Sequence, residues 1–215
     1  MPLLTSVNVA CGFHAGDPAI MQRTCALAHQ NGCTIGAQVS YPDLAGFGRR
    51  FIEMQPAELT SAVLYQLGAL EAFARLAGSK VRYVKPHGAL YNAIVRHEVQ
   101  AAAVAAAVAA YDPSLAVLGL PESAISAECK SLGVRFVEEG FADRAYADDG
   151  SLVPRTQPGA LITDPGAAAV QALALAQRGI ESICVHSDTP GAPEILATVA
   201  VALVTAGFQT HPFVL

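Results

Sequence analysis

The sequence has few charged residues, and they are not grouped by sign. Asp, Glu, Lys and Arg make up 14% of the 215 residues, the formal net charge is −5, and no run of basic residues occurs. Proteins that bind nucleic acid or an anionic membrane surface concentrate Lys and Arg on one face. The composition therefore argues against nucleic acid and membrane surfaces as partners.

Long apolar runs are also lacking. The longest, around residues 101–110 and 196–208, are shorter than the roughly 20 residues that a spanning helix needs. Residues 1–6 lack the basic flank and the apolar stretch of a signal peptide. The five cysteines include no CxxC pair, and an odd, scattered set is typical of reduced thiols. We therefore expect a cytoplasmic protein without a membrane segment.

Several well-known functional motifs are absent. The chain contains no GxxxxGK[ST] phosphate loop, no GxSxG nucleophile elbow and no HExxH zinc motif. It therefore has no recognisable nucleotide site of its own. Hydrophobic residues make up 53% of the chain, which is too many for a disordered protein. A chain of this length favours one large domain, residues 1–215.

Apolar, β-branched runs alternate with helical patterns along most of the chain. Five of these patterns start at or near a proline and stop at a glycine, the usual asymmetry of helix ends. The helices are expected at residues 18–31, 56–77, 121–132, 165–178 and 190–206. Strands are expected at Ser6–Ala10, Thr34–Val39, Val81–Lys85, Leu115–Leu120, Val134–Glu138 and Ser182–His186, with a weaker one at Ala160–Thr163.

This alternation predicts an α/β fold. Strands that are apolar on both faces and separated by helices pair in parallel through right-handed crossovers. Two architectures satisfy the pattern: an open doubly wound sheet and a closed (β/α) barrel. The residue pattern alone leaves both open. The loop Asp143–Pro158 is the longest stretch without periodicity, and we expect it to be an active-site loop.

Three histidines directly follow predicted strands. They are His14, His87 and His186. In parallel α/β folds, ligands bind at the C-terminal ends of the strands, so we expect these side chains to converge on one site. Each could serve as a metal ligand, a general base or an oxyanion donor. The alternative is that each is a hydrogen-bonded structural histidine.

Further polar residues lie at the same strand ends. Asp143 and Asp188 are candidates for orienting a histidine or binding a cation. Lys85 could act as a catalytic ammonium group or bind a substrate carboxylate. The alternative is a structural lysine at the edge of the sheet. The run Gly46–Arg50 could wrap an anion with its backbone N–H groups and its two guanidinium groups.

Five blocks of the sequence resemble one family. They are NVACGFHAGDP at 8–18, YPDLAGFGRR at 41–50, VKPHGALYN at 84–92, FADRAY at 141–146 and CVHSDTPG at 184–191. Together and in this order they are similar to the LamB/YcsF lactam-utilisation family, the A subunits of bacterial ATP-dependent 5-oxoprolinase. The resemblance extends over almost the whole chain. It implies a distorted, TIM-like (β/α) barrel of the glycoside hydrolase/deacetylase type.

The resemblance also implies an activity and partners. The activity is hydrolysis of 5-oxo-L-proline (pyroglutamate) to L-glutamate, coupled to ATP hydrolysis, in a complex with 5-oxoprolinase subunits B and C. ATP is then used by the complex, and a divalent metal is a further candidate, with His14 and His87 as its candidate ligands. The catalytic candidates are His14, Lys85, His87, His186 and Asp188. The substrate-binding candidates are Asn8, Arg49, Arg50, Tyr91, Asp143 and Arg144.

These residues suggest a mechanism as a hypothesis. His186, oriented by Asp188, is the general base, and His14 and His87 lie at the reacting carbon. Lys85 and one of the two neighbouring arginines hold the substrate carboxylate or a phosphate.

Three features depart from the family pattern. Members usually begin with a strand that carries an Asp-x-Asn-x-Asp-like motif, so we expect a barrel without its first strand. Gln38 stands where the family usually has a histidine, and Ser187 stands where it has a glycine. Two alternatives therefore stay open: a metal-dependent amide hydrolase or N-deacetylase that needs no ATP, and a degenerate, non-catalytic binding subunit.

Overall fold

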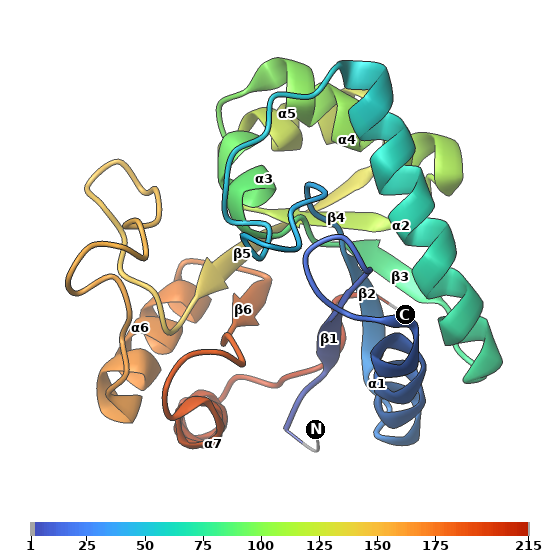
Figure 1. Ribbon diagram of the computed structural model, residues 1–215. Helices are drawn as coiled ribbons and strands as arrows, with labels where there is room; N and C mark the ends of the chain where they lie inside the picture. Colours follow the sequence, from blue (N-terminus) through green and yellow to red (C-terminus); the bar gives the residue numbers. More distant parts are fainter. Residues whose placement is uncertain (1–2, 215) are drawn as a thin grey trace. The chain divides into compact units, whose positions relative to one another are not determined.

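The computed structural model describes residues 3–214, in which helices and strands alternate (Figure 1). The chain forms two compact units, one of residues up to Val137 together with Val214, and one from Glu138 to Phe213. The elements are β1 (Ser6–Ala10), α1 (Pro18–Gln30), β2 (Thr34–Gln38), α2 (Pro56–Leu76), β3 (Val81–Val84), α3 (Gly88–Ala93), α4 (Glu98–Tyr111), β4 (Ala116–Gly119), α5 (Ala124–Ser131), β5 (Arg135–Phe141), α6 (Pro165–Gln177), β6 (Ser182–Cys184) and α7 (Ala192–Thr205).

The strands pair in the order in which they occur in the chain. In the first unit β1, β2, β3 and β4 are joined by parallel pairs. In the second unit the end of β5 pairs in parallel with β6, with Gly140 opposite Ile183. The strand order β1-β2-β3-β4-β5-β6 has no reversal, as in a (β/α) barrel, whereas a doubly wound sheet reverses its order at a switch point. The expected α/β class is confirmed, and the strand order is that of a barrel.

The core of the first unit includes a tightly packed pair of helices, α2 and α4. Leu59, Val63 and Leu67 of α2 are fully buried, at the four-residue spacing that places side chains on one helix face. The helix α4 is rich in alanine, and its small side chains let α2 approach closely. The Thr60 hydroxyl of α2 donates to the Ala103 carbonyl of α4 at 3.1 Å.

The second unit packs α6 and α7 together. Ala168 and Ala172 of α6 belong to one buried cluster with Ile195 of α7. Gly140 of β5 lets α6 pack closely, because a Cβ there would lie 2.8 Å from the side chain of Leu175.

Local capping decides where the helices begin. The helices α1, α2 and α6 begin at the predicted prolines. The prediction for α5 is wrong at its start: the helix begins at Ala124 instead of Pro121, because the Ser123 hydroxyl caps it by accepting a backbone N–H of the first turn. The helix α7 begins at Ala192 instead of Pro190, after a glycine in the left-handed region.

Three further segments differ from the prediction. The short helix Gly88–Ala93 was not predicted. The segment Ala160–Thr163 is not a strand, since Leu161 forms only an isolated antiparallel bridge with Arg144. The strand β5 continues beyond its predicted end to Phe141, which brings the polar residues that follow it directly to the strand end.

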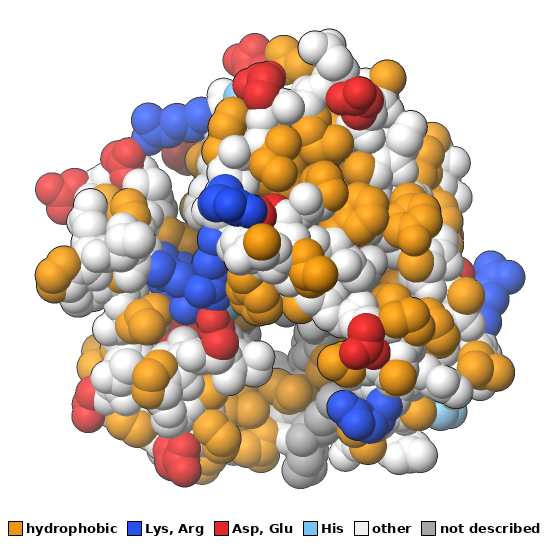
Figure 2. Space-filling view, viewed as in Figure 1, with side chains coloured by type: hydrophobic (Ala, Val, Ile, Leu, Met, Phe, Trp, Pro, Cys, Tyr) orange, Lys and Arg blue, Asp and Glu red, His pale blue; other side chains and the backbone are white. Residues whose placement is uncertain are grey.

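The five cysteines form no disulfide bond, and apolar side chains are exposed on the surface. All five cysteines are free and four are buried; burial raises the pKa of Cys25 to about 11. Within residues 3–214 no helix combines the length and the apolar character that crossing a membrane requires. Apolar side chains do reach the surface of the first unit, as Figure 2 shows, and Leu44 and Tyr65 are among them.

Candidate functional site

A tight turn after β1 buries the first candidate histidine. Gly12 and Gly16 of this turn have backbone φ angles of 96° and 82°, in the left-handed region that favours glycine. A Cβ on Gly16 would lie 2.3 Å from the carbonyl oxygen of Ala10. Because the turn passes this close to the strand end, His14 within it is only 1% exposed.

His14 and His87 form a stacked pair. Their ring centroids are 3.9 Å apart and their planes differ by 9°. His87 follows β3, and its backbone N–H donates to the Val39 carbonyl at 2.8 Å, which fixes it beside the end of β2. The expectation that histidines from different strand ends meet is confirmed for these two.

The Phe47 carbonyl determines which ring nitrogen of His87 carries the proton. The Phe47 ring lies edge-on to His14 and His87, with centroid distances of 5.6 and 5.3 Å. The Phe47 carbonyl oxygen lies 2.9 Å from Nε2 of His87. Because a carbonyl oxygen only accepts hydrogen bonds, Nε2 is the protonated nitrogen and Nδ1 of His87 is the unprotonated one.

Both rings are neutral at neutral pH. Burial lowers the pKa of His14 to about 4, although a hydrogen bond with Gln38 acts in the opposite direction. Burial, together with the neighbouring His14 ring, lowers the pKa of His87 to about 3. The pair therefore offers uncharged nitrogen atoms rather than a cation.

These pKa values predict a loss of stability in mild acid. In the unfolded chain both histidines bind protons below about pH 6.5, whereas in the folded chain His14 does so only below about pH 4. Stability is therefore fully present above pH 6.5 and is lost as the pH falls towards 4, by on the order of a few kcal/mol. Urea titrations at pH 7, 6 and 5 measure this slope. The double variant His14→Gln, His87→Gln is the control, and an equally steep slope in it would contradict the assignment.

The stacked pair does not have the geometry of a shared metal site. A histidine ligand directs a nitrogen lone pair at the metal in its ring plane, about 2.0–2.1 Å away for zinc. The lone pairs of His14 and His87 lie in nearly parallel planes and do not converge, since the rings are 9° from parallel. Within residues 3–214 no group of three or more His, Cys, Asp or Glu side chains is placed to hold a metal ion.

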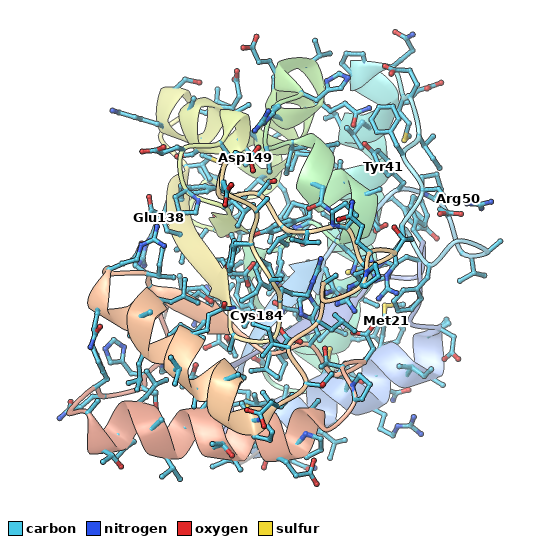
Figure 3. All side chains as sticks on the ribbon, turned by 90° about the vertical axis from the view of Figure 1, so that its left-hand side faces the viewer. Met21, Tyr41, Arg50, Glu138, Asp149 and Cys184 are labelled. Atoms are coloured by element: carbon cyan, nitrogen blue, oxygen red, sulfur yellow. The ribbon has the colours of Figure 1, made fainter. Side chains whose placement is uncertain are left out.

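The arginine-rich loop is closed by a carboxylate at its own start. Asp43 accepts from the N–H of Gly46 at 2.9 Å and from Nε of Arg50 at 3.0 Å, and it also pairs with the Arg50 terminal nitrogen. The Arg50 side chain stays 67% exposed, and Figure 3 shows it at the edge of the molecule. The Arg49 guanidinium lies 4.9 Å from the centre of the Phe47 ring. Arg50 thus closes the loop, and Arg49 is the arginine placed beside the histidine pair.

The other candidates of the first unit lie on or after its strands. Lys85 is 3% exposed, a buried position rather than an edge position, and its Nζ lies 5.9 Å from the centre of the Tyr91 ring. Asn8 accepts a hydrogen bond from the Tyr83 hydroxyl at 2.8 Å. The Tyr83 ring reaches across β2 because Gly36 has no side chain: a Cβ there would lie 2.1 Å from the ring.

Two buried polar atoms at the pair have no hydrogen-bond partner among the described residues. They are Nδ1 of His14 and Oγ of Ser40. Ser40 is fixed by Gln66 of α2, which accepts from its N–H at 2.8 Å and donates to its carbonyl at 2.9 Å. Sequence reasoning missed Ser40 and Gln66, because a buried glutamine in a helical pattern has no local signal.

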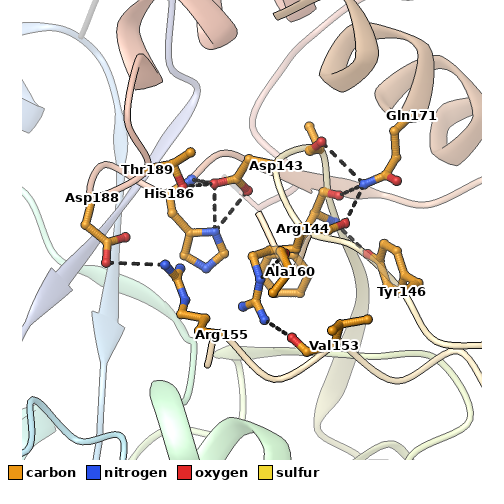
Figure 4. A network of polar contacts seen from close by, with 12 residues as sticks. Asp143, Arg144, Tyr146, Val153, Arg155, Ala160, Gln171, His186, Asp188 and Thr189 are labelled. Carbon is orange, nitrogen blue, oxygen red and sulfur yellow. Dashed lines mark hydrogen bonds and ion pairs between the residues drawn. The ribbon is translucent and has the colours of Figure 1, made fainter. Parts of the chain in front are cut away.

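In the second unit Asp143 holds His186. Oδ1 of Asp143 lies 2.9 Å from Nδ1 of His186, and Oδ2 accepts the His186 backbone N–H at 3.0 Å (Figure 4). The Thr189 hydroxyl also donates to Oδ2. Burial by itself would raise the pKa of Asp143, but these hydrogen bonds hold it below its ordinary value. The ionised carboxylate therefore keeps the proton on Nδ1, and Nε2 of His186 is the basic nitrogen.

The expected role of Asp188 is corrected by this geometry. Its carboxylate pairs with Arg155, with 3.5 Å between Oδ2 and Nη1, while the hydrogen bonds that orient His186 come from Asp143. The Phe141 ring stacks on the imidazole of His186, with centroids 5.1 Å apart. That His186 shares one site with the pair of the first unit stays a prediction.

The loop after β5 is ordered by two side-chain donors, the buried Arg144 and the half-buried Gln171. Arg144, 5% exposed, donates through Nη2 to the Val153 carbonyl at 2.6 Å and through Nε to the Ala160 carbonyl at 3.3 Å. Gln171 of α6 donates to the carbonyls of Phe141 and Arg144 at 2.5 and 2.8 Å. These bonds hold the backbone on both sides of Asp143 (Figure 4). Substrate binding by Arg144 stays a prediction.

Comparison with known sequences gives long matches. The sequence model of the LamB/YcsF family matches residues 1–214. The A subunit of 5-oxoprolinase from Mycobacterium avium is 52% identical over 224 residues, covering 98% of this chain and 89% of the relative. The A subunit of 5-oxoprolinase from Streptomyces avermitilis is 50% identical over 226 residues, covering 99% and 90%.

Comparison with solved structures gives the same family of proteins. The crystal structure of a lactam utilization protein from Thermus thermophilus superposes with a TM-score of 0.88 at 42% identity. The match covers 99% of this chain and 90% of that one. The expected fold class is therefore supported by an experimental structure as well as by the strand order.

Proposed function

The chain belongs to the LamB/YcsF family, and on this basis we propose that it is the A subunit of an ATP-dependent 5-oxoprolinase in the cytoplasm. The reaction is the hydrolysis of 5-oxo-L-proline to L-glutamate, with ATP converted to ADP and phosphate. The relatives named as A subunits of 5-oxoprolinase, at about half identity over nearly the whole chain, are the observation that supports it. Their names describe one part of a larger complex, and we propose subunits B and C as the partners.

The proposed chemistry activates a poor electrophile. ATP phosphorylates the amide oxygen of the lactam, which makes the ring carbon susceptible to water. A base removes a proton as water attacks, the ring C–N bond breaks, and the nitrogen takes up a proton and leaves as the amine of glutamate. The resulting acyl phosphate is then hydrolysed by a second water, which releases phosphate and gives the carboxylate of glutamate. Because this chain has no phosphate-loop motif, we propose that the partner subunits supply the phosphorylation.

The residues of the two units supply separate roles in this proposal. His186, held by Asp143, is the general base, since the contact of Asp143 with Nδ1 leaves Nε2 as the basic nitrogen and fixes the orientation of the ring. The neutral pair of His14 and His87 binds the amide group. Lys85 and Arg49 are the cations for the substrate carboxylate. The rival of a metal-dependent amide hydrolase gains no support from the stacked pair, whose lone pairs do not converge.

A coupled assay tests the proposal. The mixture contains 5-oxoproline, ATP and subunits B and C, with and without this chain, and glutamate release is followed. We expect turnover only in the complete mixture. Turnover by the isolated chain with a divalent ion, abolished by a chelator, would instead support the metal-dependent hydrolase. Ligand-induced thermal stabilisation without any turnover in the complete mixture would support the non-catalytic subunit.

Replacing His87 with alanine should abolish coupled glutamate formation. Loss of a group that contacts the reacting amide is expected to cost at least ~100-fold in rate, while the circular dichroism spectrum stays that of a folded chain. His29→Ala is the matched control, because His29 is exposed in the last turn of α1. Undiminished turnover in His87→Ala would remove His87 from the mechanism.

A further inference from the structure

One ring nitrogen of the histidine pair is both unprotonated and open to a ligand. Nε2 of His87 donates to the Phe47 carbonyl at 2.9 Å, so the single proton of the neutral ring is on that side. His87 is partly exposed, and within residues 3–214 no group hydrogen-bonds to its Nδ1. Nδ1 of His14, in contrast, is a buried atom.

The surroundings keep this nitrogen an acceptor. Turning the His87 ring over would remove the hydrogen bond to the Phe47 carbonyl, so this bond favours the observed orientation of the ring. The stacked His14 ring, 3.9 Å away, confines the His87 plane. Protonation of Nδ1 is opposed by burial and by the positive charges of Arg49 and Lys85. The atom therefore presents a lone pair and no proton.

We propose that Nδ1 of His87 accepts the ring N–H of the lactam substrate and thereby selects a lactam over its ring-oxygen analogue. This rests on the proposed function for the identity of the substrate. A neutral acceptor matches an amide N–H, whereas it would repel a carboxylate or phosphate oxygen. A lactone has the same five-membered ring and carbonyl group, but its ring oxygen would direct a lone pair at the lone pair of Nδ1.

The first experiment uses the full chain and two small probes. The probes are 2-pyrrolidinone and γ-butyrolactone, which differ in having N–H or oxygen in the ring. In protein labelled with ¹⁵N-histidine, the His87 signals, assigned by their loss in His87→Gln, should show an unprotonated Nδ1 from pH 5 to 8. We expect 2-pyrrolidinone to shift the Nδ1 signal and γ-butyrolactone to bind at least ~10-fold more weakly, the effect of one lost hydrogen bond. A protonated Nδ1, an equal response to both probes, or no response to either would overturn the proposal.

The second experiment uses variants that separate the two ring nitrogens. The amide of His87→Gln can still donate to the Phe47 carbonyl but has no acceptor in the place of Nδ1. Ligand-observed saturation transfer should therefore show at least ~10-fold weaker binding of 2-pyrrolidinone to His87→Gln, and unchanged binding to His29→Gln. Equal binding to both variants would contradict the proposal.

The outcomes also distinguish this inference from the proposed function. If the complete mixture releases no glutamate but the chain prefers 2-pyrrolidinone through His87, the N–H contact stands and the proposed reaction is wrong. If glutamate is released but the chain treats the two probes alike, the reaction stands and the contact is wrong.

Discussion

Replacing Asp143 with asparagine is expected to lower the rate of 5-oxoproline hydrolysis by about three orders of magnitude while the chain stays folded. Asp143 accepts three hydrogen bonds, two from His186 and one from Thr189. An asparagine amide has one oxygen and one NH₂ group, so it cannot accept all three. If the NH₂ group faces Nδ1 of His186, the ring proton must move to Nε2, and the base is lost.

The measurement is kcat and KM in the coupled assay, with Asp188→Asn as the matched control. Both substitutions remove one negative charge close to His186, but Asp188 pairs with Arg155 at the surface of the second unit. We therefore expect Asp188→Asn to have a much smaller effect than Asp143→Asn, and the loss in Asp143→Asn to fall on kcat. Equal losses in the two variants, or a larger one in Asp188→Asn, would restore Asp188 as the residue that orients the base.

The contrast between these two carboxylates shows what the sequence could and could not predict about the site. The sequence indicated both Asp143 and Asp188 as candidates for orienting a histidine, and the mechanism hypothesis assigned this role to Asp188. The actual partner, Asp143, follows the neighbouring strand β5, and parallel pairing of β5 with β6 brings it to the same strand end. The sequence could not decide between the two carboxylates, because the choice depends on the register of two strands that are paired in space.

Other parts of the prediction were limited by similar causes. His14 and His87 were predicted together because the C-terminal ends of parallel strands lie at the same edge of the sheet. The helix Gly88–Ala93 was missed because it is only six residues long and begins with a glycine. A glycine is needed there because the backbone of Gly48 passes close by: a Cβ on Gly88 would lie 2.3 Å from the carbonyl oxygen of Gly48. Pattern and periodicity describe whole elements, and they do not register a single close contact between two loops.

Gly48 takes part in such a close contact between loops. Its replacement by alanine is expected to disrupt the stacked pair of His14 and His87. A Cβ at this position would lie 2.3 Å from Oγ of Ser40, 2.9 Å from Cβ of His14 and 3.0 Å from Cδ2 of His87. The Ser40 hydroxyl can rotate away, but the two histidine atoms cannot move without breaking the stack. Gly48 also has a φ of 67°, which costs a residue with a Cβ roughly 1–2 kcal/mol. Together with overpacking, the expected loss in unfolding free energy is about 3 kcal/mol.

Gly32→Ala separates the two causes of this loss. Gly32 has the same φ of 67°, and a Cβ there would meet nothing within 4 Å, so the substitution measures the backbone strain alone. Urea titrations of both variants should therefore show a larger loss in Gly48→Ala, and only Gly48→Ala should change the NMR signals of His14 and His87. Adding Ser40→Gly to Gly48→Ala should recover part of the stability, because it removes the nearest clash. If Gly48→Ala loses no more than Gly32→Ala, the loop does not press on the pair, and the fixed orientation of His87 has another cause.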